Sequence, residues 1–211
     1  MNDDDRPRRR PGGAGSTRRA ELLAIAEELF ATRGYSQTTV RDIADEAGIL
    51  SGSLYHHFQS KEAMLQEILQ DFMRTLLAGF VASTESGGGP RESLDGLVRS
   101  AFATIHASPH AVALYQNESA VIASLPELGF VGETSTQVNQ VWLGVLEQGQ
   151  LTGEFRDDLD PLVVYRFIRD AVWATVRWYR PDGRLQHEAV ADQYLAMLHG
   201  GLLRPGQSGQ G

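Results

Sequence analysis

A short stretch between residues 51 and 61 carries most of the side chains suited to recognising a nucleic acid. Gly52 leaves room for a close approach of the backbone to a partner. Hydroxyl and imidazole groups, which hydrogen-bond to base edges and phosphates, stand at five positions: Ser51, Ser53, Tyr55, His56 and His57. The stretch therefore predicts noncovalent recognition of DNA. The alternative interpretation is an ordinary loop and helix with exposed aromatic side chains.

Lys61 is the only lysine in the chain, and it falls in the first turn of the helix expected after this stretch. A cation at a helix N-terminus is unfavourable, because the helix dipole is positive at that end. A phosphate bound there would offset the repulsion. We therefore predict that Lys61 meets a negatively charged group.

Four helices are predicted to position these residues: one between Thr17 and Gly34, one from Thr38 or Thr39 to Gly48, one at 51–58, and one from the Ser60 cap through Phe80. Gly34 and Gly48 end the first two, Thr38 or Thr39 caps the second, and Ser51 caps the third. The second and third are short and separated by a tight turn. These are the dimensions of a helix-turn-helix, whose second helix enters the major groove.

Helical periodicity continues to about residue 203, and no alternating strand pattern is present. Asp160 followed by Pro161 predicts a helix that begins at Pro161 and reaches about Tyr179. Gly149 and Gly153 are expected to end the helix before it. Other helices are expected at 94–105, from 109, around 138–146 and at 185–203. The sequence thus predicts an all-α fold of about nine helices.

Charge and composition divide the chain into parts. From residue 6 to residue 61 there are nine basic and six acidic residues, whereas residues 62–211 hold ten arginines against eighteen acidic residues. A part that binds a polyanion is therefore expected near the N-terminus. The expected parts are a disordered basic arm (1–16), a helix-turn-helix DNA-binding domain (17–62), a ligand-binding and dimerisation domain (63–203) and a flexible tail (204–211).

The chain contains no cysteine, which excludes disulfides, thiolate metal sites and a cysteine nucleophile. The first residues lack the apolar run of a signal peptide, and no segment approaches the ~20 apolar residues of a membrane span. We therefore expect a cytoplasmic protein without a membrane partner.

Residues 38–65, TTVRDIADEAGILSGSLYHHFQSKEAML, resemble the DNA-binding domain of the TetR family of one-component bacterial regulators. The matching pattern is a threonine before the second helix, then I-A-x-x-A-G, S-x-S-L-Y-x-H-F and S-K-E-x-x-L. GEFRDDLDP at 153–161 is similar to the family's link into its penultimate helix. By position, the resemblance implies phosphate contacts from Tyr55 and Lys61. It implies further contacts to bases or backbone from Thr39, Arg41, Ser51, Gly52, Ser53, His56 and His57.

The same resemblance implies a nucleoid-associated homodimer on double-stranded operator DNA, joined through the last two helices. The sequence supports this independently, because the helix from Pro161 is apolar most of the way round and must be covered on more than one side. Two-fold symmetry then predicts a palindromic operator with half-sites one helical turn apart (~34 Å), or a multiple of it.

On that helix, Arg169, Trp173 and Arg177 are expected to share one face. Arginines beside a flat aromatic ring suit a ligand that carries a ring and a phosphate or carboxylate. An Arg166–Asp170 ion pair, with arginines pairing across the dimer, explains the same residues. Aromatic residues at helical spacing form either simple core or an apolar pocket: Phe72, Phe80, Phe102, Tyr115, Trp142 and Phe167.

ILSGSLYHHFQSKE and the RWYRPDG turn at 177–183 are similar to one subgroup, the actinobacterial repressors of the later steps of cholesterol ring degradation. This implies a repressor without a cofactor, released by an inducer that is a coenzyme A thioester of a bicyclic steroid remnant. Arg169 and Trp173 match a ligand-binding pair of that subgroup. A TetR-like regulator of another pathway, such as efflux or fatty-acid metabolism, is the alternative.

Enzyme motifs such as G-x-S-x-G, a P-loop or G-x-G-x-x-G are absent from the sequence. His106 and His110 have the spacing of two zinc ligands, but Pro109 lies between them and no glutamate follows His106. We therefore predict neither an enzyme nor a metal site. The other rival is a sequence-independent architectural DNA-binding dimer, whose arginine-rich arm neutralises phosphates.

Overall fold

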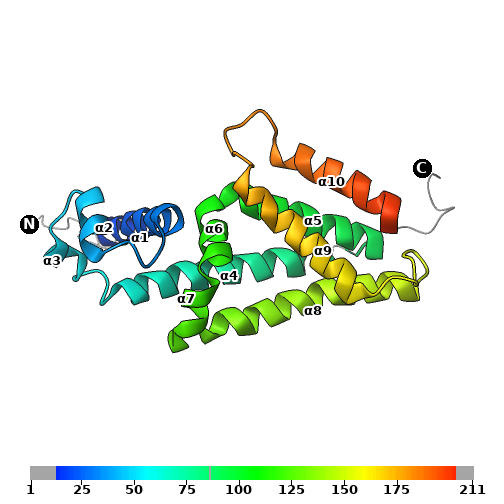
Figure 1. Ribbon diagram of the computed structural model, residues 1–211, viewed down its shortest axis with the longest axis horizontal. Helices are drawn as coiled ribbons and strands as arrows, with labels where there is room; N and C mark the ends of the chain where they lie inside the picture. Colours follow the sequence, from blue (N-terminus) through cyan, green and yellow to red (C-terminus); the bar gives the residue numbers. More distant parts are fainter. Residues whose placement is uncertain (1–12, 86, 203–211) are drawn as a thin grey trace, which may run out of the picture. The chain divides into compact units, whose positions relative to one another are not determined.

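The computed structural model describes residues 13–85 and 87–202, which form ten α-helices and two short 3-10 helices with no β-strand among them (Figure 1). The all-α expectation is confirmed, with one α-helix more than the nine expected. The chain divides into two compact units, Met1–Leu65 and Gln66–Gly211. Most of the expected arm and the whole expected tail lie outside the described residues. Residues 13–16, expected in the arm, form the first turn of α1.

The first unit contains α1 (Gly13–Arg33), α2 (Val40–Glu46), α3 (Ser51–Leu54) and the first residues of α4 (Lys61–Thr84). Arg18 donates to the carbonyl of Ala47 at 2.7 Å, and the Arg19 guanidinium lies 4.4 Å from the centre of the Phe58 ring. The unit encloses a small apolar core: Leu22, Ala26, Leu29, Phe30, Ile43, Ala44, Leu54, Phe58, Met64 and Leu65.

The limits of α2 follow from its caps. Thr39 is the N-cap, because its hydroxyl accepts from the Asp42 amide at 3.1 Å while its own amide donates to the Asp42 carboxylate at 2.7 Å. At the other end, Gly48 has φ +65°, a backbone conformation that favours glycine. The amide of Ile49 then donates to the Ala44 carbonyl at 2.9 Å, which completes a Schellman turn.

Helix α3 is shorter than the 51–58 expected from the sequence, and Ser51 is its first residue, not its cap. The cap position is Leu50, which supplies no side-chain hydrogen bond. The helix ends where the amides of His57 and Phe58 both donate to the Leu54 carbonyl, at 2.9 and 3.0 Å. Residues 55–57 therefore present their side chains from a turn.

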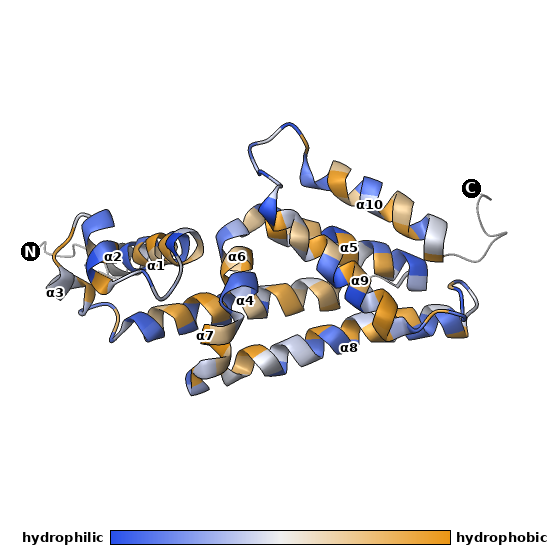
Figure 2. Cartoon of the chain, in the orientation of Figure 1, coloured by the Kyte–Doolittle hydropathy of each residue, from blue (hydrophilic) through white to orange (hydrophobic). Residues whose placement is uncertain are grey.

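The second unit places α5 (Pro90–Ala107) at its centre, in contact with α6 (Pro109–Asn117), α8 (Gly129–Leu151), α9 (Pro161–Ala174) and α10 (His187–Leu202) (Figure 1). Figure 2 shows apolar and polar residues alternating along α8 and α10, as expected for amphipathic helices. After α4, the second unit contains, in chain order, α5, α6, α7 (Ser119–Ser124), η1 (Pro126–Leu128), α8, α9, η2 (Thr175–Arg177) and α10. No described helix is long and apolar enough to cross a membrane.

Two helix ends differ from the sequence prediction. Helix α8 continues through Gly149, whose missing Cβ makes room for the Phe155 ring: a Cβ there would lie 2.0 Å from a ring carbon. Helix α9 begins as expected, with Asp160 accepting from the amides of Leu162 and Val163 at 2.8 and 3.2 Å. It ends at Ala174 and not near Tyr179, because the chain tightens into the 3-10 turn η2.

Candidate DNA-binding and ligand-binding sites

The residues predicted to contact DNA lie in the first unit, at the start of α2, on α3, in the turn after it and at the start of α4. The Tyr55 side chain is 56% exposed. Thr39, Arg41, Gly52, Ser53 and His56 are also exposed, and Ser51, His57 and Lys61 are half-buried. Arg41 lies 3.6 Å from Asp45, but both side chains are open to solvent, so this pair is weak.

Three of these residues, Thr39, Tyr55 and Lys61, surround one hollow of about 390 Å³. Ser36 and Gln59, two residues that the sequence analysis missed, line it as well. Hydroxyl, amide and ammonium groups around a small open hollow are suited to holding a phosphate. Ser36 and Gln59 are polar residues beside the predicted caps, and only that position distinguishes them in the sequence.

Lys61 already has partners inside the unit. Its ammonium donates to the carbonyls of Tyr35 and Thr38, at 2.9 and 3.0 Å, and lies 4.0 Å from the centre of the Tyr35 ring. The helix dipole alone predicts an external anion beside Lys61, but these two backbone carbonyls already compensate for part of its charge. An ammonium has three donors, so one remains for a phosphate in the hollow.

Glu62, the next residue on α4, also lines the hollow and accepts from the Tyr35 hydroxyl at 3.1 Å. A hydrogen bond from its own backbone amide is the main cause that lowers the pKa of Glu62. The carboxylate therefore stays ionised and helps to fix the Tyr35 ring on which Lys61 rests.

The second unit holds a cavity of about 610 Å³, a size typical of small-molecule sites. Of the predicted ligand-binding residues, Arg169, Trp173 and Tyr115 line it. The Arg169 Nε donates to the Asp170 carboxylate at 2.8 Å, and the guanidinium lies 5.7 Å from the centre of the Tyr165 ring. The Arg169–Asp170 pair replaces the Arg166–Asp170 pair expected from helical spacing.

Polar side chains inside the cavity are largely satisfied by one another. The Tyr115 and Ser135 hydroxyls lie 3.0 Å apart, and the Tyr165 hydroxyl donates to Asn139. Burial raises the pKa of Tyr165 to about 12, so its phenol stays protonated. Tyr165, Asn139 and Ser135 were missed from the sequence, where only helical spacing relative to Arg169 and Trp173 could have indicated Tyr165.

Helix α7 and η1 form another part of the cavity wall that was not expected. Ser119, Ile122 and Ala123 of α7 line the cavity, as do Pro126 and Leu128 of η1. No residue of α7 is buried. The wall on this side is therefore a short helix with little packing of its own.

The other predicted ligand-binding residues are not among those that line the cavity: Phe72, Phe102, Trp142 and Arg177. Phe72 stands behind Tyr115, at 5.6 Å between ring centres, Phe102 packs on Tyr194, and Trp142 packs on Phe80. Arg177 is exposed and lies in the 3-10 turn η2, where the angular step per residue differs from that of the α-helix assumed in the prediction.

Within the described residues, no group of three or more His, Cys, Asp or Glu side chains is placed to hold a metal ion. His106 instead bonds to the Tyr179 hydroxyl at 2.8 Å and stacks on His187, with ring centres 4.5 Å apart. The described residues therefore offer a surface for an anion and a cavity for a small molecule.

Residues 22–68 match the family described as bacterial regulatory proteins, tetR family, and residues 87–202 match the tetracyclin repressor-like C-terminal domain. The chain is 47% identical over 197 residues to the HTH-type transcriptional repressor KstR2 of Mycobacterium tuberculosis, which covers 93% of this chain and 98% of that protein. The solved structure of that ketosteroid transcriptional regulator has a TM-score of 0.86 and 48% identity, covering 89% of this chain and 95% of that one. The structure of AibR in complex with isovaleryl coenzyme A and operator DNA has a TM-score of 0.74 and 26% identity, covering 85% and 97%.

These matches confirm the resemblance inferred from the recognition region, and they extend it through the second unit. KstR2, to which the chain is similar over nearly its whole length, is a transcriptional repressor and not an enzyme. The chain therefore belongs to the TetR family and is a transcriptional repressor of that type, not an enzyme.

Proposed function

We propose that this repressor binds a palindromic operator as a dimer and leaves it when a small-molecule inducer occupies the second unit. The observation that carries the proposal is the cavity of about 610 Å³, formed by residues of the second unit alone. A protein that only coats DNA has no use for such a cavity, whereas a regulator needs a place for its effector.

The proposed DNA contacts are divided by chemistry. Tyr55 and Lys61 hold phosphates, supported by the hollow that they line with Thr39. Base edges are read from α3 and the turn after it, by Ser53 and His57, which approach the major groove. The remaining members of the set contact the backbone or nearby bases: Arg41, Ser51, Gly52 and His56.

The proposed dimer uses α9 and α10. Leu162, Val163 and Phe167 of α9 are 42%, 45% and 73% exposed, and Met197 of α10 is 78% exposed. Exposed apolar side chains on two helices of one unit are consistent with a surface that another molecule covers. A second copy related by two-fold symmetry covers the same surface on both partners and presents two recognition helices to the operator.

The proposed inducer is an acyl coenzyme A thioester from steroid ring catabolism. KstR2 is described as a ketosteroid regulator, which supports the steroid part of this proposal, and AibR was solved with isovaleryl coenzyme A, which supports the thioester part. In the cavity, the terminal amino groups of Arg169 suit an oxygen of the thioester, a carboxylate or a phosphate. The Trp173 ring beside it offers a flat apolar surface to a ring.

Helix α4 is the element through which the inducer would act. Met73 and Leu76 of α4 line the cavity, and Lys61, the first residue of the same helix, holds the Tyr35 and Thr38 carbonyls. If an inducer binds more tightly to a second position of α4, it shifts α4 toward that position. The size of the shift is set by the difference in binding free energy between the two positions.

The DNA half is tested by selecting the protein against random duplex DNA at about 150 mM salt, where non-specific binding is weakened. A palindrome in the bound pool is expected. Tyr55→Phe should weaken binding to the palindrome and to its base variants alike, whereas Ser53→Ala should change which bases are preferred. An unenriched pool would favour the sequence-independent architectural dimer instead.

The sensing half is tested by titrating the operator complex with acyl coenzyme A thioesters, free coenzyme A and fatty acids. In Arg169→Ala, the thioester concentration needed to release the operator should rise tenfold or more. This is on the order expected for the loss of a charge-assisted hydrogen bond. Arg166→Ala is the matched control, because Arg166 is exposed on the same helix and does not line the cavity. Equal release by every compound would contradict the proposed inducer class.

A further inference from the structure

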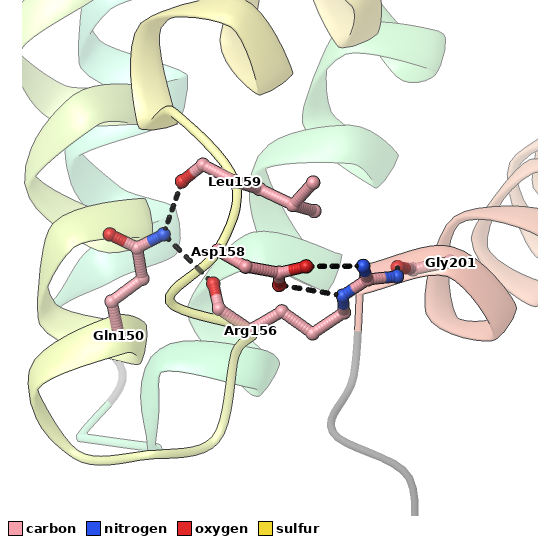
Figure 3. A network of polar contacts seen from close by, with 5 residues as sticks. All are labelled: Gln150, Arg156, Asp158, Leu159 and Gly201. Atoms are coloured by element: carbon pink, nitrogen blue, oxygen red, sulfur yellow. Dashed lines mark hydrogen bonds and ion pairs between the residues drawn. The ribbon is translucent and has the colours of Figure 1, made fainter.

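The connection between α8 and α9 holds the last turn of α10 (Figure 3). The backbone amide of Arg156 donates to the carbonyl of Leu202 at 3.1 Å. Its side-chain Nη1 donates to the carbonyl of Gly201 at 3.2 Å. The final carbonyls of a helix have no partner within the helix. Arg156 therefore supplies two of them with donors and a positive charge, which also suits the negative end of the helix dipole.

The guanidinium of Arg156 is fixed by a second set of bonds. Its Nε and Nη2 donate to the two carboxylate oxygens of Asp158, at 2.9 and 2.6 Å, in a bidentate arrangement. Hydrogen bonds from Arg156 to Asp158 raise the pKa of Arg156, so the charge is permanent. The Gln150 amide, at the end of α8, donates to the carbonyls of Arg156 and Leu159 at 2.8 and 2.7 Å and fixes the backbone of the connection.

This clasp, formed by Gln150, Arg156 and Asp158, lies immediately before α9. Asp160, two residues after Asp158, is the N-cap of α9. Helix α10 packs mainly on α5, whereas α9 packs on both α8 and α5. The clasp therefore joins the beginning of α9 to the end of α10, two helices that otherwise rest mainly on other elements.

Both joined helices carry the exposed apolar residues of the proposed dimer surface. Leu162 and Val163 lie in the first turn of α9, directly after the clasp, and Met197 lies in the second half of α10. Because these residues are on separate helices, they fit a partner only while the two helices keep one spacing. An exposed ion pair contributes little to stability, so this pair is better suited to fixing geometry than to stabilising the fold.

We propose that Arg156 is a positioning residue for dimerisation: by bonding Asp158 and the Gly201 carbonyl, it sets the spacing of α9 and α10 that a second copy of this chain recognises. The inference rests on the proposed function, because it requires the dimer through these two helices. It adds a residue that lies outside the apolar surface and acts on it through the helices that it joins.

The test is the dimer dissociation constant of the full chain, measured by sedimentation equilibrium. Arg156→Gln should raise it on the order of tenfold, the equivalent of one charge-assisted hydrogen bond. Arg99→Gln is the matched control, because Arg99 pairs with Asp192 at 2.6 Å and joins α10 to α5 without touching the start of α9. The control should change the constant by less than about twofold, within the range of an exposed ion pair.

Asp158→Asn and Gln150→Leu separate geometry from general loosening. Both should raise the dimer dissociation constant in the same direction as Arg156→Gln, while helix content and the unfolding midpoint of the monomer change little. In all three variants the backbone amide at position 156 should exchange with solvent faster, because its bond to the Leu202 carbonyl is no longer held in place.

Equal weakening by Arg156→Gln and Arg99→Gln would overturn the inference, since it would show that any loosening of α10 has the same effect. An unchanged constant in Arg156→Gln would overturn it as well, and would leave the proposed dimer intact. A wild-type chain that stays monomeric at every concentration would overturn both the dimer and the role of Arg156.

Discussion

Lys61 rests on the Tyr35 ring, with its ammonium 4.0 Å from the ring centre and 2.9 Å from the Tyr35 carbonyl. The first residue of α4 is thereby bound to the loop between α1 and α2, which also carries Thr39, the cap of α2. A single side chain thus stabilises the DNA-binding unit and lines the hollow proposed for a phosphate.

Lys61→Met should destabilise the DNA-binding unit by about 1–2 kcal/mol, because the carbonyls of Tyr35 and Thr38 lose a charged donor. Urea unfolding measures this difference. Arg41→Gln is the control, since Arg41 lies 3.6 Å from Asp45 on an exposed surface and should change stability by less than about 0.5 kcal/mol. A wild-type midpoint for Lys61→Met would show that water replaces the ammonium at both carbonyls.

Gly149→Ala should destabilise the second unit by about 1–3 kcal/mol, the usual cost of overpacking, because its Cβ would lie 2.0 Å from the buried Phe155 ring. Gly144→Ala, on the same helix with no atom within 4 Å of the added Cβ, should instead stabilise by about 0.5–1 kcal/mol. Thermal unfolding distinguishes the two signs. The double variant Gly149→Ala/Phe155→Leu should recover part of the lost stability. If it recovers none, the clash with the Phe155 ring is not the cause of the loss.

Stability should fall between about pH 10 and pH 12. Burial raises the pKa of both Tyr165 and Tyr194 to about 12, from an ordinary value near 10. Below pH 10 both phenols are protonated in the folded and unfolded chains, and their contribution is fully present. Above it the unfolded chain ionises first, so stability is lost as the pH rises toward 12, by about 2 kcal/mol for each tyrosine.

Denaturant unfolding at several alkaline pH values, compared with Tyr165→Phe and Tyr194→Phe, measures that slope. Each variant should flatten it by removing one ionising group. If the unfolding free energy falls with pH equally steeply in all three proteins, groups other than these two tyrosines cause the alkaline loss of stability.

Gly132→Leu should abolish induction while leaving operator binding intact. Gly132 lines the cavity, and an added Cβ meets no atom within 4 Å, so the backbone there tolerates a side chain that competes with a ligand for the cavity. Gly144→Leu, equally open but outside the cavity lining, should keep a wild-type response. Operator-release titrations with an acyl coenzyme A thioester compare the two. Unchanged release in Gly132→Leu would exclude this cavity as the inducer site.

The elements that the sequence predicts best are those with a chemical marker at their ends. Thr39, Gly48 and Asp160 act as the caps and the turn expected of them, which is why α2 and the start of α9 were found correctly. Helix α7 was missed because it buries none of its residues and so leaves no apolar periodicity to find.

The candidate sites were predictable only where they depend on local spacing. Arg169 and Trp173, one turn apart, both line the cavity, but Arg177 does not, since a change from α-helix to 3-10 helix has no periodic signal. The bond from Lys61 to the Tyr35 carbonyl joins positions 26 residues apart, and neither residue type reveals it.

The lack of buried residues in α7 has a kinetic consequence. Only Val121 and Ile122 of α7 are even half-buried, so this segment opens at a lower local cost than unfolding of the whole unit. Since α7 forms a wall of the cavity, a ligand can exchange through it while the rest of the bundle stays folded. The residence time of the proposed inducer should then depend on α7 more than on global stability, and variants of Ser119–Ser124 should change how quickly repression returns once the inducer is consumed.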